Sequence, residues 1–305
     1  MPDYDRLWKE IITELFEEFL LFFAPDLYEV VDFSQPPRSR EQELYKLSPS
    51  SKTKNRRADK LIGLKLKNGK EQWILVHIEV QGDREPDFQM RMFQYFYRAL
   101  DKFNQKLYAI ALFTDDSPTF KPNTYNYHFF GTELVYKYHI YKILEQNENE
   151  LLQSSNPFAL VILAGLYVIK GKRQENLKYP YKKKLMRLLL ENTSMARKRI
   201  EKLFIFIDHV IELNEIETET LAYEITPFIE QEGTKMSLSL EDTSFAKYYK
   251  RVGKEEGFEE GIKEGEAKGI ILGQKEVARK MIKEGYAIDI IEKLTGLSRE
   301  EIEKL

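Results

Sequence analysis

The chain has 305 residues, 42% of them hydrophobic and 32% charged, with a formal net charge of −3. Its length and apolar content allow two packed domains, so disorder is not the expected state of the chain. The absence of cysteine excludes disulfides, thiolate catalysis and cysteine-held zinc. Because the net charge is slightly negative, any contact with DNA must come from local basic patches.

The first predicted element is an amphipathic helix. Apolar residues recur at helical spacing from Tyr4 to Phe23, and Pro25 ends the pattern. Residues 33–54 are rich in proline, serine and charge, which leaves room for one short strand at Leu44–Leu47. No basic leader precedes the first helix, and no apolar run approaches the ~20 residues that a bilayer requires. We therefore expect a cytoplasmic protein with no membrane partner.

A β-hairpin follows. Asp59–Leu66 and Trp73–Gln81 are predicted as its strands, on either side of the loop Lys67–Gly69. If all three loop residues form the turn, with Gly69 in the left-handed conformation, Leu66 pairs with Lys70.

This register decides where two acidic residues lie. Counting back from the loop places Asp59 opposite His77 and Arg57 opposite Glu79, so both carboxylates share one face. Asp59 is then diagonal to Glu79, at about 7–8 Å between backbone positions. A two-residue turn would instead place them on opposite faces.

Glu79 lies in an otherwise apolar strand, where a carboxylate needs a partner, a hydrogen bond or a cation. Two carboxylates without thiolates suit Mg²⁺ or Mn²⁺ rather than zinc. Such ions can polarise a phosphate and activate water, as phosphodiester hydrolysis requires. The alternative is a structural ion pair between Glu79 and Arg57, and these residues alone favour neither interpretation.

A helix from Phe88 to Phe103 and an apolar strand at Leu107–Thr114 come next, and an alternating stretch at Leu134–Ile140 is predicted to close the sheet. Arg91 and Arg98 recur on one side of the helix. They suit phosphate contacts, although a solvated helix face explains them equally well. Two acidic residues after the strand, Asp115 and Asp116, are expected to be turn residues.

Only helices are predicted beyond residue 145, at Pro157–Ile169, Tyr181–Leu190, Ser194–Leu213 and Glu217–Glu230. We expect three regions: a sheet-containing domain at 1–145, a helical domain at 146–245 and a tail at 246–305. The helical domain contains the densest basic region, a candidate DNA track formed by Lys182, Lys183, Lys184, Arg187, Arg197, Lys198 and Arg199.

The tail begins with glycine at every fourth position from Gly253 to Gly273, at a cost of about 1 kcal/mol per glycine in a helix. A self-association face that forms a homo-oligomer, most simply a dimer, would offset this cost, and a flexible linking helix is the alternative. The end of the chain has helix-turn-helix spacing, with Ser298 capping a last helix at Arg299–Leu305. Because that helix is acidic, a protein-contact module is an equal alternative.

Several of these residues together resemble the Rpn family of recombination-promoting nucleases, which are also described as putative transposases. The resemblance extends from about Tyr4 to Asp116, with looser similarity in the glycine repeat and at Thr295–Ser298. It rests on Arg57-Ala58-Asp59-Lys60, Trp73 to Val76, His77-Ile78-Glu79-Val80-Gln81, Asp87-Phe88 and Arg91.

This resemblance implies an α/β fold: a PD-(D/E)XK, restriction-endonuclease-like core with a mixed sheet, followed by an all-helical region. Asp59 would be the motif aspartate and Glu79 the second acidic ligand, joined by the Val80 carbonyl. Gln81 stands where the superfamily has lysine and cannot act as a base. Metal binding can also involve an acidic residue of the first helix, for which Glu10 or Glu14 is the candidate.

The function expected from these observations is a Mg²⁺- or Mn²⁺-dependent endonuclease acting on double-stranded DNA, in a recombination or mobile-element setting that the resemblance alone implies. Asp59, Glu79 and Gln81 would be its catalytic residues, and Arg57, Arg91 and Arg98 its DNA contacts. One alternative is a catalytically silent DNA-binding or assembly protein that retains the nuclease fold. Another is an enzyme that acts on a different phosphodiester, such as RNA.

Overall fold

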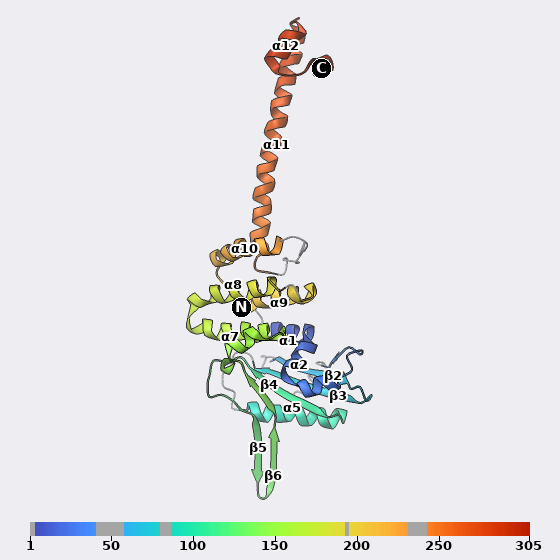
Figure 1. Cartoon of the computed structure of the whole chain (residues 1–305), viewed down its shortest axis with the longest axis vertical. Coiled ribbons are helices and arrows are strands. Elements are labelled where there is room, and N and C mark those ends of the chain that lie inside the picture. Colours follow the sequence, from blue (N-terminus) through green and yellow to red (C-terminus); the bar gives the residue numbers. More distant parts are fainter. Residues whose placement is uncertain (1–3, 41–57, 80–86, 193–194, 231–242) are drawn as a thin grey trace. The chain divides into compact units, whose positions relative to one another are not determined.

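The computed structural model describes residues 4–40, 58–79, 87–192, 195–230 and 243–305. Of residues 58, 59, 71–79, 230, 247 and 256 it describes the backbone only. The chain forms two compact units, Met1–Ser244 and Phe245–Leu305, which we consider separately. In Figure 1 the first unit contains the sheet and most of the helices.

The N-terminal segment forms three helices: α1 (Tyr4–Glu14), α2 (Phe16–Phe23) and α3 (Pro25–Val30). The single helix predicted for Tyr4–Phe23 is interrupted at Leu15, whose backbone departs from helical angles at φ −113° and ψ 38°. Leu15 is fully buried, as are Trp8 and Ile12 of α1. The apolar periodicity survives the break because both helices bury the same type of side chain.

The main sheet has the order β1-β2-β3-β4-β7. Its strands are β1 (Arg38–Ser39), β2 (Ala58–Lys65), β3 (Glu71–Glu79), β4 (Leu107–Phe113) and β7 (His139–Lys142). β2 pairs antiparallel with β1 and β3, whereas β4 pairs parallel with β3 and β7. Between β3 and β4 runs α5 (Phe88–Phe103), as a parallel connection requires. The predicted hairpin, helix and strand are confirmed, and the strand expected at 44–47 lies outside the described residues.

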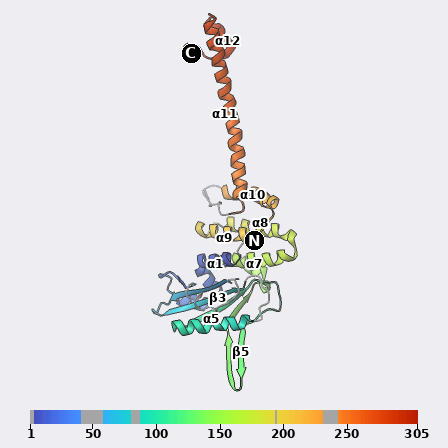
Figure 2. The same ribbon diagram turned by 180° about the vertical axis from the view of Figure 1, so that it is seen from behind.

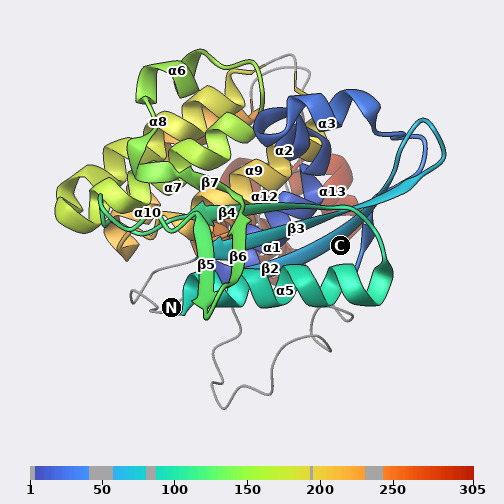
Figure 3. The same cartoon turned by 90° about the horizontal axis from the view of Figure 1, so that it is seen from below.

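Helices cover both faces of this sheet (Figure 3). On one face, Leu61 of β2 packs with Tyr95 of α5, and Phe88 of α5 packs with Phe113 of β4. On the other face, the Lys60 ammonium donates a 2.5 Å hydrogen bond to Thr13 of α1. Since neighbouring residues of a strand point to opposite faces, the odd-numbered positions of β2, β3 and β4 form the face toward α5.

The stretch predicted as one closing strand, Leu134–Ile140, is instead divided between two sheets. β6 (Thr132–Lys137) pairs with β5 (Thr124–Phe129), and within the described part of the chain the two strands form a separate two-stranded ribbon. The end of the stretch belongs instead to β7, which forms the edge of the main sheet beside β4. The alternation misled the prediction because Leu134, Tyr136, Tyr138 and Ile140 all pack against one apolar cluster while the chain changes partners between them.

Helices complete the first unit: α6 (Glu148–Gln153), α7 (Phe158–Arg173), α8 (Lys178–Leu190), α9 (Arg197–Val210) and α10 (Glu215–Glu230), with short 3₁₀ turns at Ile143–Glu145 and Glu175–Leu177. The four predicted helices correspond to α7–α10, and α6 was not predicted. α1 packs on α9 and α2 on α7, so both halves of this unit share a core. A domain boundary near residue 145 stays a prediction.

The second unit consists of α11 (Ala246–Lys283), α12 (Ile288–Thr295) and α13 (Arg299–Glu303). The glycine repeat lies within the single long helix α11 (Figure 2). Residues Ala278, Ile291, Leu297 and Ile302 form a small core that holds the last three helical segments together. Among the helices described, none has the length and apolarity needed to cross a membrane.

Candidate nucleic-acid and metal site

The loop between β2 and β3 sets the register of the hairpin. Gly69 adopts φ 81°, and the amide of Leu66 donates to the carbonyl of Lys70 at 2.8 Å. The Asn68 side chain accepts a hydrogen bond from the Lys70 amide at 3.0 Å, which fixes the turn. Three residues therefore form the loop, and Asp59 pairs with His77. This is the predicted register.

The register places positions 59, 77 and 79 on one face of the sheet, because facing residues of paired strands share a face. Position 79 pairs in turn with Phe113 of β4, which packs against α5. The backbone of the predicted site thus lies on the α5 face, at the carboxyl end of β3. The side chains of Asp59 and Glu79 are outside what the structure describes, and so are residues Arg57, Val80 and Gln81.

Glu10 and Glu14 do not join this face. They belong to α1, which contacts β2 through Lys60, on the side opposite to position 59. Glu10 forms an exposed ion pair with Arg6 at 3.5 Å, and Glu14 pairs with Lys202 at 3.4 Å. A metal-binding role for either glutamate stays a prediction that gains no support from the geometry.

α5 brings basic residues to the predicted site face. Tyr95 is buried against Leu61, two residues from Asp59, and Arg91 and Arg98 lie one turn before and after it on the same side of the helix. The Arg91 guanidinium is 5.5 Å from the ring centroid of Phe88. Because Phe88 contacts Phe113, the partner of position 79, Arg91 lies close to that end of β3.

The basic charge of Arg91 also acts on Tyr138. Burial raises the pKa of the Tyr138 hydroxyl, and the nearby Arg91 charge opposes that rise. The hydroxyl itself donates to the Pro122 carbonyl at 2.6 Å. Arg91 therefore faces the junction of α5 with the β-ribbon as well as the end of β3. Both arginines are half-buried, so the side of α5 that carries them is not a fully solvated face.

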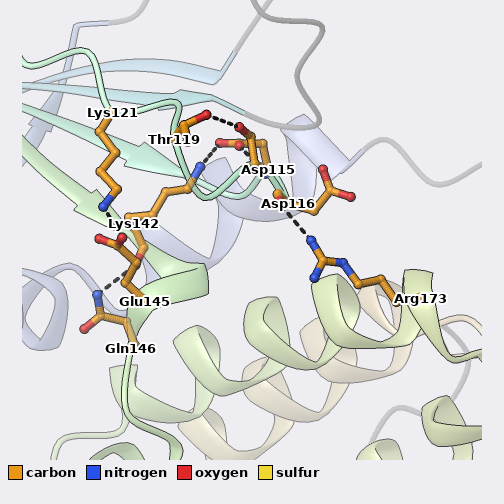
Figure 4. A network of polar contacts seen from close by, with 9 residues as sticks. Asp115, Asp116, Thr119, Lys121, Lys142, Glu145, Gln146 and Arg173 are labelled. Carbon is orange, nitrogen blue, oxygen red and sulfur yellow. Dashed lines mark hydrogen bonds and ion pairs between the residues drawn. The ribbon is translucent and has the colours of Figure 1, made fainter.

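A buried ion pair at the same edge of the sheet was not predicted. Lys142, the last residue of β7, is 2.5 Å from Asp115, which follows β4 (Figure 4). Only 2% of the Lys142 side chain and 6% of the Asp115 side chain are exposed. Asp115 also accepts the amide hydrogen of Ser117 at 2.9 Å, as expected of a turn residue.

Phe113 of β4 lies between this ion pair and the predicted site. Phe113 pairs with position 79 on one side and with Lys142 on the other, and the Lys142 ammonium lies 5.5 Å from the Phe113 ring centroid. Around it, Lys121 pairs with Glu145 and Arg173 donates to the Asp116 carbonyl at 3.0 Å (Figure 4). The network fixes the carboxyl ends of β4 and β7. No sequence signal marked Lys142, because a strand-terminal lysine is ordinarily exposed.

The basic region of the helical half does not form an open DNA track. Lys182 is buried and pairs with Asp208 at 2.7 Å. The pairs Lys183–Glu224, Lys184–Glu148, Arg187–Glu191 and Arg199–Glu18 neutralise most of the remaining charge. Apart from Glu191, which lies one turn from Arg187, these acidic partners come from other segments of the chain, so the local excess of lysine and arginine stabilises helix packing.

Chemically, the described part of the site offers apolar packing and two arginines, and its acidic members are known only by backbone position. A group of three or more His, Asp or Glu residues able to hold a metal is not found among the side chains that the structure describes. Two carboxylates and a main-chain carbonyl would nevertheless suit a hard divalent cation.

The C-terminal unit has helix-turn-helix features. Gly296 adopts φ 75° between α12 and α13. The Ser298 side chain accepts from the Glu301 amide while Glu301 accepts from the Ser298 amide at 2.9 Å, which makes a capping box. Hydrogen bonds from the Ser298 amide and from the Ser298 hydroxyl to the Glu301 carboxyl lower the pKa of that carboxyl. The predicted turn and cap are confirmed.

Residues 273–305 match the family described as "Rpn/YhgA-like nuclease family, C-terminal HTH domain". No curated protein and no solved structure matches the chain. The match favours the helix-turn-helix interpretation of the tail over a general protein-contact module. It supports the Rpn family resemblance, a nuclease-related function and DNA binding, and it covers only the end of the chain.

Proposed function

We propose that this protein is a Mg²⁺- or Mn²⁺-dependent DNA endonuclease of the PD-(D/E)XK type. The observation that carries the proposal is the hairpin register, which puts positions 59 and 79 on one face, the face on which α5 packs with Arg91. The element order supports it: three helices, three strands, a helix and a strand, with the acidic positions at the adjoining ends of β2 and β3. The nuclease family matched by the tail supports it independently.

In this proposal Asp59, Glu79 and the Val80 carbonyl hold the divalent cation. When bound, the cation would polarise the phosphate and lower the pKa of a water molecule. Gln81 orients the water or a phosphate oxygen, since its amide can donate and accept hydrogen bonds but carries no charge. Arg57, Arg91 and Arg98 hold the DNA backbone through charge-assisted hydrogen bonds. The substrate is double-stranded DNA, and the setting is recombination or movement of genetic elements.

The tail would contribute DNA binding and pair two chains. Six glycines cost α11 about 6 kcal/mol relative to alanine, and a methyl group on any of them would meet open space. Next to this row lie exposed apolar side chains, Phe258, Ile262 and Ile270. A second copy of α11 packed along these residues would offset the cost by burying them. Such pairing would place two helix-turn-helix units for a two-fold DNA site.

The test is cleavage of supercoiled plasmid by purified full-length protein with Mg²⁺, with Mn²⁺ and with EDTA. We expect nicking or linearisation in the presence of metal, and complete loss in Glu79→Ala and in Asp59→Ala. Glu71→Ala is the matched control, because Glu71 lies at the far end of the same strand, paired with Lys65. Equal cutting by Glu79→Ala and the wild type would reject the site assignment.

The second candidate is a catalytically silent DNA-binding protein, which Gln81 in the lysine position favours. It predicts DNA binding that is unaffected by EDTA, together with no cleavage at any metal concentration. Cleavage of RNA of the same sequence, tested under the same metal condition, would distinguish a ribonuclease from both the DNA endonuclease and the silent DNA-binding protein.

A further inference from the structure

The ribbon formed by β5 and β6 extends from the first unit on the α5 side of the sheet (Figures 1 and 2). Its two strands pair from Thr124–Lys137 at the base to Phe129–Thr132 at the end. Phe130 and Gly131 form the connecting turn. The base is anchored on α5, where the Tyr125 ring stacks on Phe93 at 5.1 Å and 12°. Among the described residues, no helix anchors the outer half in this way, and Tyr127 and Phe129 there are exposed.

Aromatic residues occupy one face of this ribbon. Tyr125, Tyr127 and Phe129 alternate along β5 and therefore point the same way, about 7 Å apart from one to the next. Tyr127 is 45% exposed and Phe129 is 59% exposed, whereas Tyr125 is partly covered. On α5, Phe93 stacks in turn on the exposed Tyr97 at 5.5 Å. We call Tyr97, Phe93, Tyr125, Tyr127 and Phe129 the aromatic row.

The turn of the ribbon holds Phe130 in an unfavourable state. Its φ of 43° and the φ of 80° at Gly131 correspond to a two-residue hairpin turn that normally has Asn, Asp or Gly at the first position. A phenylalanine there costs about 1–2 kcal/mol. The side chain recovers little of this cost within the protein, because it is 92% exposed and contacts chiefly Phe129, at 4.7 Å between ring centroids.

Charge distinguishes this face from the opposite one. The ionisable groups His128, Glu133 and Lys137 alternate with the aromatic residues and therefore lie on the other face, where Glu133 pairs with His128 at 3.5 Å. The face carrying Tyr125, Tyr127 and Phe129 presents no carboxylate to repel a phosphate backbone. It offers flat rings to an uncharged planar partner, and nucleobases are such partners.

The ribbon is also connected to the candidate site. Its Tyr136 ring packs against Phe96 of α5 at 4.6 Å and belongs to the apolar cluster that contains Phe113, the partner of position 79. A nucleic-acid strand bound along the aromatic row would therefore extend toward the face of the main sheet that carries position 79.

From these observations we infer that the aromatic row and Phe130 bind the unpaired bases of a DNA strand, so that the preferred substrate carries a single-stranded segment beside duplex. The location of this segment next to the cleavage site rests on the proposed function, but the binding itself does not. Stacking on exposed aromatic side chains is tolerant of base sequence, so affinity should depend little on sequence.

The experiment measures binding of full-length protein to a labelled single-stranded oligonucleotide and to its duplex, in EDTA to prevent cleavage. Tyr127→Ala and Phe129→Ala should each weaken single-strand binding by about 5-fold to 150-fold, the range for one lost base stack. Val135→Ala is the control, because Val135 is also exposed but lies on the opposite face, and it should leave binding unchanged. A 2-aminopurine base in the oligonucleotide should be quenched by the wild type and less by Phe129→Ala.

Phe130→Asn separates function from folding. Asparagine suits the left-handed conformation, so the variant should unfold at the same or a higher temperature while binding the single strand more weakly. Phe130→Trp should retain binding.

Three outcomes would overturn the inference: unchanged single-strand affinity in Tyr127→Ala and Phe129→Ala, an equal loss in Val135→Ala, or a change only in self-association or in binding to phospholipid vesicles. Because no step requires catalysis, a protein that binds but never cuts would refute the nuclease proposal and leave this one intact.

Discussion

Replacing Lys142 by methionine tests whether the buried ion pair fixes the carboxyl edge of the sheet. The substitution preserves most of the side-chain volume but removes the ammonium partner of the Asp115 carboxylate, which is 6% exposed and still accepts from the Ser117 amide at 2.9 Å. Removing one partner of a buried pair costs about 3–5 kcal/mol, because the remaining charge is desolvated without compensation. For a unit of this size, the melting temperature should fall by about 6–20 °C.

The assay is thermal unfolding of the full-length protein, followed by the near-ultraviolet signal of its aromatic residues. Glu191→Gln is the matched control, since it breaks a pair that is 48% exposed on both sides and should cost less than about 1 kcal/mol. Adding Asp115→Asn to Lys142→Met should recover part of the loss, because asparagine still accepts from Ser117 but leaves no buried charge. A loss in Lys142→Met no larger than that in Glu191→Gln would refute the reasoning.

Two further predictions concern acid stability and association. Burial by itself raises the pKa of the Glu148 carboxyl, but hydrogen bonds from Lys170, Tyr167 and Lys184 outweigh it and lower the pKa from its ordinary 4.5 to about 2. A carboxyl whose pKa is lowered by folding stabilises the protein at pH values above its unfolded-state pKa. This stabilisation is lost as the pH falls through the folded-state pKa, here between about pH 4.5 and pH 2. After allowance for solvent screening, the stabilisation amounts to about 1–2 kcal/mol. Urea unfolding from pH 6 to pH 2 should show this loss in the wild type and not in Glu148→Gln, and parallel curves would contradict it. In α11, the double substitution Gly261→Ala and Gly265→Ala should raise the helix content of the protein but convert its dimers to monomers, as measured by sedimentation. The control variant Lys263→Ala should remain dimeric. Dimers that persist in the double variant would exclude the glycine face as the contact between the two chains.

Local patterns predicted most of the elements correctly. The loop Lys67–Gly69 determined the register of β2 and β3 because a left-handed glycine and a three-residue turn allow only one pairing. α5 followed from its apolar period, and the last helix from the Ser298 cap. These features depend on residues close together in the chain, so their physical causes are present in the sequence itself.

The candidate site was predictable only in part. The shared face of positions 59 and 79 followed from alternation, but the face on which α1 packs did not, and Glu10 and Glu14 proved to lie on the other side. Arg91 and Arg98 were equally compatible with solvent until Tyr95 was seen against Leu61. The metal ligation of Asp59 and Glu79 stays a prediction.

What only the tertiary structure decided involves partners distant in the sequence. Lys142 pairs with Asp115 because β7 joins the sheet beside β4. The stretch predicted as one strand contributes to two sheets, although its alternating apolar side chains all pack against one cluster. The basic residues from Lys182 to Arg199 became packing contacts once their acidic partners were known. Periodicity specifies which side of an element is apolar, whereas long-range pairing depends on the free energy of the whole packed unit and has no local signature.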